Sequence, residues 1–111
     1  MTDPNQTSIP PEAIKDMSES AADAAAYLKT LAHEGRLMIL CHLGSGEKSV
    51  GELEELLSMR QAAVSQMLAR LREEGLVTTR RDGKTIYYTL AGTHTQQVIG
   101  LLHSLFCPVD A

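Results

Sequence analysis

The strongest constraint on the fold comes from residues 60–90, where one helical pattern is followed directly by two short runs of β-forming residues. The apolar residues of the helical part recur at helical spacing, at Val64, Met67, Leu68 and Leu71. Gly75 follows where a left-handed helix cap is expected. The runs LVTTRR and KTIYYTL come next, joined by Asp82-Gly83, a dipeptide that suits a two-residue hairpin turn. This stretch therefore predicts a helix over 60–74 and then a β-hairpin.

The remaining sequence predicts four further helices. Apolar periodicity and alanine-rich composition favour helices over residues 13–29, 33–43, 50–57 and 93–106. Ser49 precedes the third of these, and Glu52 lies three residues later, as in a capping box. The chain has 43% apolar residues, no tryptophan and only three tyrosines and one phenylalanine, which is typical of a helical core. We expect a mainly α (α+β) fold, a winged helix-turn-helix with five helices and a two-stranded β-hairpin wing.

The 111 residues match one small domain that gains buried surface by dimerising. The proline-rich start predicts a flexible N-terminal arm over 1–12, which is followed by the winged helix-turn-helix domain over 13–107 and a C-terminal tail over 108–111. There is no apolar run of about 18 residues and no secretory signal pattern, so we expect a cytoplasmic protein without a membrane partner. Cytosolic thiols stay reduced, so a permanent disulfide between the two cysteines is not expected.

Charge is spread unevenly along the chain. The net charge is -4, but residues 60–84 carry six basic and three acidic side chains, against four basic and eleven acidic ones elsewhere. A basic segment on an acidic body lets one face meet phosphates while the rest of the surface repels them.

The helix over 60–74 and the hairpin are therefore candidates for DNA contact. In a helix-turn-helix the second helix enters the major groove with small or polar side chains. Gln61, Ser65 and Gln66 can bind base edges, while Ala62 and Ala63 permit close approach and can touch a thymine methyl. The expected phosphate contacts are Arg60, Arg70, Arg72, Arg80, Arg81 and Lys84, of which the last three flank the hairpin turn. A solvated surface helix and hairpin, in a purely structural dimeric adaptor, are the alternative.

Three stretches resemble the ArsR/SmtB family of bacterial repressors over about residues 25–106. They read YLKTLAHEGRLMILCHL, VGELEELLSMRQAAVSQMLARLREEGLV and TTRRDGKTIYYTL. The resemblance implies a DNA-binding transcriptional repressor, not an enzyme. It implies a homodimer joined through the first and last helices, bound to an inverted-repeat operator of double-stranded DNA and released by an inducer. An apolar stripe on the last helix fits this dimer interface, although it also fits the core of one protomer: Val98, Ile99, Leu101, Leu102, Leu105 and Phe106.

Many members of this family bind metal ions. One of their sites has cysteines at the start of the third helix, where this chain reads KSVGEL, and another has carboxylates along the last helix, where residues 91–109 have none. We therefore predict no metal site and no cofactor. His103 with Cys107, and His42 beside Cys41, leave an improvised Cys/His zinc site as an alternative. A metal(loid)-responsive repressor, sensing zinc or arsenite, is thus the second hypothesis.

The two cysteines add a further resemblance. The motif ILCHL around Cys41, with Phe106-Cys107 near the end, resembles the persulfide-responsive SqrR/BigR/YgaV-like subgroup. This implies that persulfide links Cys41 and Cys107 through a disulfide or polysulfide bridge, which lowers operator affinity at genes of sulfide oxidation and detoxification.

The residues themselves leave the roles of both cysteines open. Cys41 alone would be an inert small hydrophobe in an apolar helix, whereas Cys107 precedes Pro108, which pushes it out of helical geometry. Each inserted sulfur could extend the reach of a bridge by roughly 2 Å beyond that of a disulfide. A thiol oxidoreductase is disfavoured because the chain lacks CxxC and a glycine-rich cofactor loop.

Overall fold

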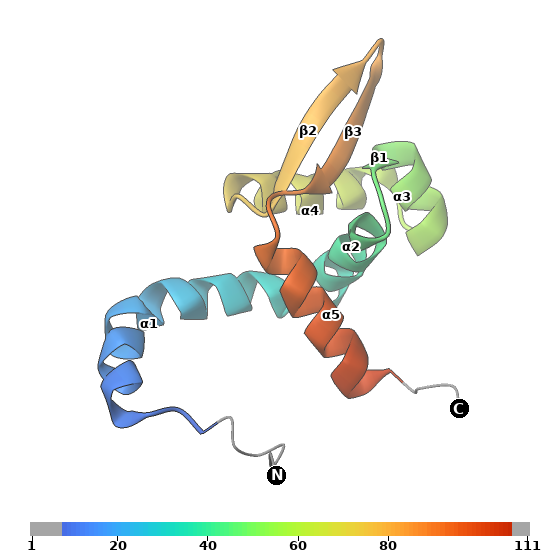
Figure 1. The fold of residues 1–111 in the computed structure, drawn as a ribbon. Helices are drawn as coiled ribbons and strands as arrows, with labels where there is room; N and C mark the ends of the chain where they lie inside the picture. The colour runs from blue at the N-terminus through green and yellow to red at the C-terminus, as the bar shows by residue number, and fades with distance from the viewer. Residues whose placement is uncertain (1–7, 108–111) are drawn as a thin grey trace.

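The computed structural model describes residues 8–107, which form five helices and a small antiparallel sheet (Figure 1). The elements are α1 (Pro11–Leu31), α2 (Glu34–Gly44), β1 (Lys48–Ser49), α3 (Val50–Leu57), α4 (Gln61–Glu73), β2 (Val77–Asp82), β3 (Thr85–Leu90) and α5 (His94–Phe106). The predicted order of five helices with a hairpin before the last one is confirmed. Within residues 8–107, no helix combines the length and apolarity needed to cross a bilayer.

The ends of the helices follow from local chemistry. Ser49 Oγ accepts a hydrogen bond from the Glu52 N–H at 3.2 Å, and Glu52 Oε1 accepts one from the Ser49 N–H at 2.8 Å, so the predicted capping box is confirmed. Helix α1 begins at Pro11, two residues earlier than predicted, because proline is preset for the first helical position. The predicted arm over 1–12 therefore ends before Pro11. Its residues 1–7, and the tail over 108–111, lie outside the described residues.

The sheet has the strand order β1-β3-β2 and is antiparallel throughout. Asp82 pairs with Thr85, so the turn residues are Gly83, with φ of 65°, and Lys84. The prediction that Asp82-Gly83 forms the turn is therefore wrong by one residue, because Asp82 takes part in the strand pairing. A third strand, β1, joins the hairpin through the pairing of Lys48 with Tyr88, and no sequence pattern had indicated it.

Helix α2 lies at the centre of the packing and contacts α1, α3, α4, α5 and β3. The buried apolar residues around it are Leu31, Ile39, Leu40, Leu43, Leu53, Val64, Leu68, Leu71, Leu76, Val77 and Ile99. Helix α4 buries the side that its periodicity predicted and leaves the opposite side in solvent. Helix α4 is therefore fixed to the same core that holds α2.

Helices α1 and α5 extend from this core on the side opposite the wing (Figure 1). Only Thr30 and Leu31 of α1 are buried. The Tyr27 hydroxyl and Thr95 Oγ1 are hydrogen-bonded at 2.9 Å, which joins α1 to the start of α5. Large apolar side chains remain exposed along the two helices, at Ile14, Met17, Leu28, Leu101, Leu105 and Phe106.

Candidate functional site

Helix α4 crosses the foot of the wing (Figure 1), and its small and polar side chains are exposed. Gln61, Ala62, Ser65 and Gln66 are exposed, and Ala63 is half-buried. Arg60 occupies the cap position with extended backbone, and its side chain forms no capping hydrogen bond. The structure therefore brings the predicted base-reading residues together on one face of one helix.

A tight turn connects α3 to α4 and sets the direction of α4. Ser58 has φ of 52°, the left-handed conformation, and its N–H donates to carbonyl oxygens at the end of α3. The Met59 N–H donates to the Glu54 carbonyl at 3.2 Å. These bonds end α3 within one residue and allow α4 to begin at Gln61, giving a helix-turn-helix.

Arg80 is placed differently from the other basic residues of the wing. Its Nε and Nη2 atoms donate to both carboxylate oxygens of Glu47 at 2.6 and 2.7 Å, a two-point pair. Its guanidinium also lies 4.7 Å from the centre of the Tyr87 ring. The hydrogen bonds from Arg80 lower the pKa of Glu47, and those same bonds raise the pKa of Arg80. Arg80, predicted as a phosphate contact, thus joins the wing to the segment before β1, and sequence reasoning missed its partner Glu47.

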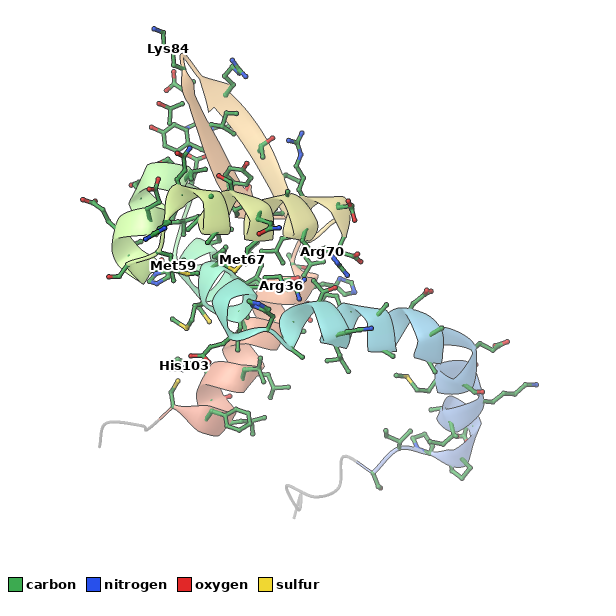
Figure 2. All side chains as sticks on the ribbon, turned by 180° about the vertical axis from the view of Figure 1, so that it is seen from behind. Arg36, Met59, Met67, Arg70, Lys84 and His103 are labelled. Atoms are coloured by element: carbon green, nitrogen blue, oxygen red, sulfur yellow. The ribbon has the colours of Figure 1, made fainter. Side chains whose placement is uncertain are left out.

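The other predicted phosphate contacts are exposed. Arg70 forms an ion pair with Glu74 at 3.2 Å on α4. Within residues 8–107, Arg60, Arg72, Arg81 and Lys84 form no ion pair with a carboxylate. Lys84 lies at the tip of the wing, far from His103 on α5 (Figure 2).

A hollow of about 440 Å³ lies between α4 and the wing. Its wall includes the predicted residues Ser65 and Arg72, together with Tyr88 of β3. Sequence reasoning had not assigned Tyr88 to this face, because only the pairing of the strands places it opposite α4. A nucleic acid that enters here would meet the helix and the wing together.

A second and larger pocket lies between α2 and α5 and contains both cysteines. Its volume is about 650 Å³, and Cys41 and Cys107 both form part of its wall. The apolar part of the wall consists of Leu37, Met38, Ile99, Leu102 and Phe106. The polar side chains are Ser45, Gln96 and His103. The two residues predicted as a sensor are therefore in one place, although they are far apart in the sequence.

The two thiols have different environments. Both are free, Cys41 is half-buried and Cys107 is exposed. Burial raises the pKa of Cys41, and the charge of the Cys107 thiolate raises it further, so Cys41 is protonated at neutral pH. Cys107 has extended backbone with φ of -90° and ψ of 139°, and α5 ends before it, as predicted from the following proline. The exposed Cys107 is thus the more accessible of the two.

The predicted dimer residues on α5 fall into three groups. Leu101, Leu105 and Phe106 are exposed, and Val98 and Leu102 are half-buried. Ile99 is only 9% exposed and packs in the core of the protomer, so it does not belong to a surface that could meet a partner. Within residues 8–107, no group of three or more His, Cys, Asp or Glu side chains is arranged to hold a metal ion.

Comparison with known proteins agrees with this geometry. The model of the bacterial regulatory protein, arsR family, matches residues 33–79. Transcriptional activator HlyU of Vibrio cholerae is 46% identical over 100 residues, which cover 90% of this chain and 93% of HlyU. The structure of reduced HlyU from Vibrio cholerae matches with a TM-score of 0.79 at 47% identity, over 85% of this chain and 99% of that one. The structure of the transcriptional repressor BigR from Xylella fastidiosa matches with a TM-score of 0.80 at 44% identity, over 86% and 97% of the two chains.

These similarities cover the helix-turn-helix, the wing and most of the flanking helices. One of the relatives is described as an activator and the other as a repressor, so both are regulators of transcription. BigR also gives its name to the subgroup that the cysteine motifs resemble. The chain belongs to the ArsR family of bacterial regulatory proteins and is a winged helix-turn-helix transcriptional regulator.

Proposed function

We propose that this regulator is a homodimeric repressor that leaves its operator when a persulfide links Cys41 to Cys107. One observation carries the proposal: two cysteines 66 positions apart open onto the same pocket between α2 and α5. Genes of sulfide oxidation and detoxification are the expected targets, through the resemblance to the persulfide-responsive subgroup.

The DNA contacts are proposed on α4 and the wing. Gln61, Ser65 and Gln66 are exposed on the outer face of α4, where side-chain amides and hydroxyls can bind base edges. Ala62 and Ala63 allow the helix to approach the bases closely. The phosphate contacts are the exposed basic residues without an ion pair to a carboxylate, Arg60, Arg72, Arg81 and Lys84. Arg70 contributes if it leaves Glu74.

The dimer is proposed to form through α1 and α5. Phe106 is 79% exposed and Leu105 is 66% exposed, which is unusual for large apolar side chains that lie close together on one helix. Ile14 and Met17 of α1 are similarly uncovered. Burying these side chains between two copies would place the two α4 helices for adjacent major grooves, about 34 Å apart on an inverted repeat.

The chemistry proceeds in two thiol–disulfide exchange steps. The Cys107 thiolate attacks the outer sulfur of a persulfide RSSH, forming a protein persulfide and releasing RS⁻, which takes up the thiol proton as RSH. Cys41 then loses its proton and attacks the sulfur bound to Cys107, which expels hydrosulfide. Overall, the dithiol loses two electrons to give a disulfide, and RSSH is reduced to RSH and H₂S. Each further RSSH inserts one sulfur into the bridge and leaves as RSH.

A bridge between α2 and α5 can reach the DNA contacts because α2 packs directly on α4. The buried residues Ile39 and Leu40 of α2 belong to the same core as Val64 of α4. Pulling α5 toward α2 would therefore disturb both the proposed dimer interface and the packing of α4 on α2. Coupling of this kind typically changes affinity by about 5 to 150-fold.

The test is operator binding under anaerobic conditions, before and after an organic persulfide, with the intact mass measured on the same samples. We expect reduced protein to bind, and treated protein to lose two hydrogens or gain bridging sulfur and to dissociate. Cys41→Ser and Cys107→Ser should each stay bound after treatment. DNA release that is unchanged in both variants would exclude the dithiol as the switch.

The metal(loid)-responsive alternative uses the same assay with zinc or arsenite in place of persulfide. It requires tight, stoichiometric binding of the metal(loid) and DNA release without any change in thiol oxidation. His103→Gln and Cys107→Ser would then abolish the response, because these two side chains are the most plausible ligand pair on α5.

A further inference from the structure

The pocket between α2 and α5 is larger than the thiol chemistry requires. Exchange between two cysteines and a persulfide needs room only for a few sulfur atoms, yet the volume is about 650 Å³. Pockets for small organic ligands span roughly 300 to 1,000 Å³. The space beyond the sulfur atoms is therefore sufficient for an organic group of several carbon atoms.

The chemistry of the wall indicates which organic group fits. Leu37, Met38 and Ile99 contribute apolar surface, and no Lys, Arg, Asp or Glu lines the pocket. The side-chain amide of Gln96 is hydrogen-bonded within the protein, since its Nε2 donates to the Gly44 carbonyl at 3.4 Å. An anionic carrier group that entered would lose hydration without meeting a Lys or Arg side chain, which is unfavourable.

We propose that this pocket binds the carrier group of the inducer and selects persulfides with an uncharged alkyl or aryl carrier over persulfides with an anionic peptide carrier, such as that of glutathione. The inference rests on the proposed dithiol switch and adds the class of molecule that operates it. The apolar group lies against the wall while its terminal sulfur meets Cys107. Bond making and breaking follow the same exchange, in which RS⁻ leaves and is protonated to RSH.

The experiment measures the rate of bridge formation with methyl, propyl and pentyl persulfide and with glutathione persulfide. Anaerobic quenched-flow samples are analysed by intact mass, and each rate is divided by the rate of the same persulfide with N-acetylcysteine to remove intrinsic reactivity. Burial of each added methylene should raise the normalised rate by up to about fourfold. The normalised rate with glutathione persulfide should be lower than the rate with methyl persulfide. A flat alkyl series, or glutathione persulfide as the fastest reagent, would overturn the inference.

Gly100 provides a matched pair of variants that leave both thiols in place. It lines the pocket within α5, and an added Cβ atom there would meet nothing within 4 Å. Gly100→Leu should fill part of the pocket and flatten the alkyl series, whereas Gly100→Ala should keep most of the dependence on chain length. Inorganic hydrogen disulfide, which has no carrier group, should react equally with both variants and with the unchanged protein. If the rate depends equally on alkyl chain length in both variants, the carrier group binds elsewhere.

A second measurement needs no variant and stays decisive if Gly100→Leu folds poorly. Methyl pentyl sulfide cannot exchange, so it should compete with pentyl persulfide and slow bridge formation without affecting hydrogen disulfide. No competition would contradict binding in the pocket. The two hypotheses fail separately: equal rates for all carriers, with normal bridging and DNA release, refute only the carrier site, whereas absent bridging refutes the dithiol switch itself.

Discussion

Arg80 and Arg81 are adjacent on the wing, but the structure predicts different effects of removing them on the salt dependence of DNA binding. Arg81 is exposed and forms no ion pair with a carboxylate in the described part of the chain, so it can neutralise a DNA phosphate. The charge of Arg80 is already compensated by the two-point pair with Glu47. We therefore expect Arg81→Ala to change the salt dependence of DNA binding, and Arg80→Ala to leave it unchanged.

The size of the effect follows from counterion release. Each phosphate contact contributes about -0.9 to the slope of log K against log salt, and a dimer carries two wings, so Arg81→Ala should flatten the slope by about 1.8. Between 50 and 200 mM KCl, the variant should then lose about twelvefold less affinity than the unchanged protein. Arg80→Ala should weaken binding by a constant factor at every salt concentration, because the wing loses its attachment to Glu47.

Fluorescence anisotropy with a labelled operator, titrated at five KCl concentrations, measures both slopes. Glu47→Gln is the matched control, since it releases Arg80 without removing it and should steepen the slope if the freed guanidinium reaches a phosphate. Equal flattening by Arg80→Ala and Arg81→Ala would show that the Glu47 pair does not persist on DNA and that the reasoning is wrong.

Three further predictions concern stability and thiol reactivity. Within residues 8–107, the buried Thr95 hydroxyl has the Tyr27 hydroxyl as its one hydrogen-bond partner. Tyr27→Phe removes this partner, so urea unfolding at fixed protomer concentration should show a loss of about 1–3 kcal/mol in the free energy of unfolding. Adding Thr95→Val should recover part of it, and a further loss would contradict the assignment. Because burial raises the pKa of Cys41, iodoacetamide should modify Cys41 more slowly than the exposed Cys107 at pH 7, and the difference in rate should narrow as pH rises through that pKa. The folded state favours the protonated thiol of Cys41, so the contribution of this group to stability is complete at neutral pH and is lost as pH rises through the raised pKa. Faster labelling of Cys41 than of Cys107 at pH 7 would refute the raised pKa. Ser49→Ala removes the capping box of α3 and should cost about 1 kcal/mol, seen as a fall of several degrees in Tm; an unchanged Tm would show that the cap is not needed.

Local sequence signals were sufficient for the elements that local chemistry determines. The five helices have apolar periodicity, and Ser49, Gly75 and Pro108 mark three of their ends before any packing is considered. Strand β1 could not be found this way, because two residues carry no periodicity and exist as a strand only through pairing with β3. Glu47 and Arg80 are 33 residues apart and meet only once that pairing is made.

The candidate sites show the same limit. The outward residues of α4 follow from helical spacing alone, and the structure places them as expected. Ile99 and Leu101 lie in the same apolar stretch, and only the position of α2 decides that Ile99 enters the core while Leu101 stays outside. Cys41 and Cys107 share a pocket because α2 and α5 pack against each other, which no spacing in the sequence reports. The family resemblance supplied that pairing.

The segment after α2 links the thiol pocket to the wing over a very short length of chain. Gly44 and Ser45 form part of the pocket wall, Glu47 holds Arg80, and the next two residues are strand β1. A displacement of the end of α2 can thus be transmitted to the wing through Glu47 and β1, within one protomer and without crossing the proposed dimer interface. An operator half-site would then report the oxidation state of its own subunit. Under the proposed switch, a dimer with one bridged subunit would keep one intact half-site contact, and loss of repression would be graded rather than all-or-none.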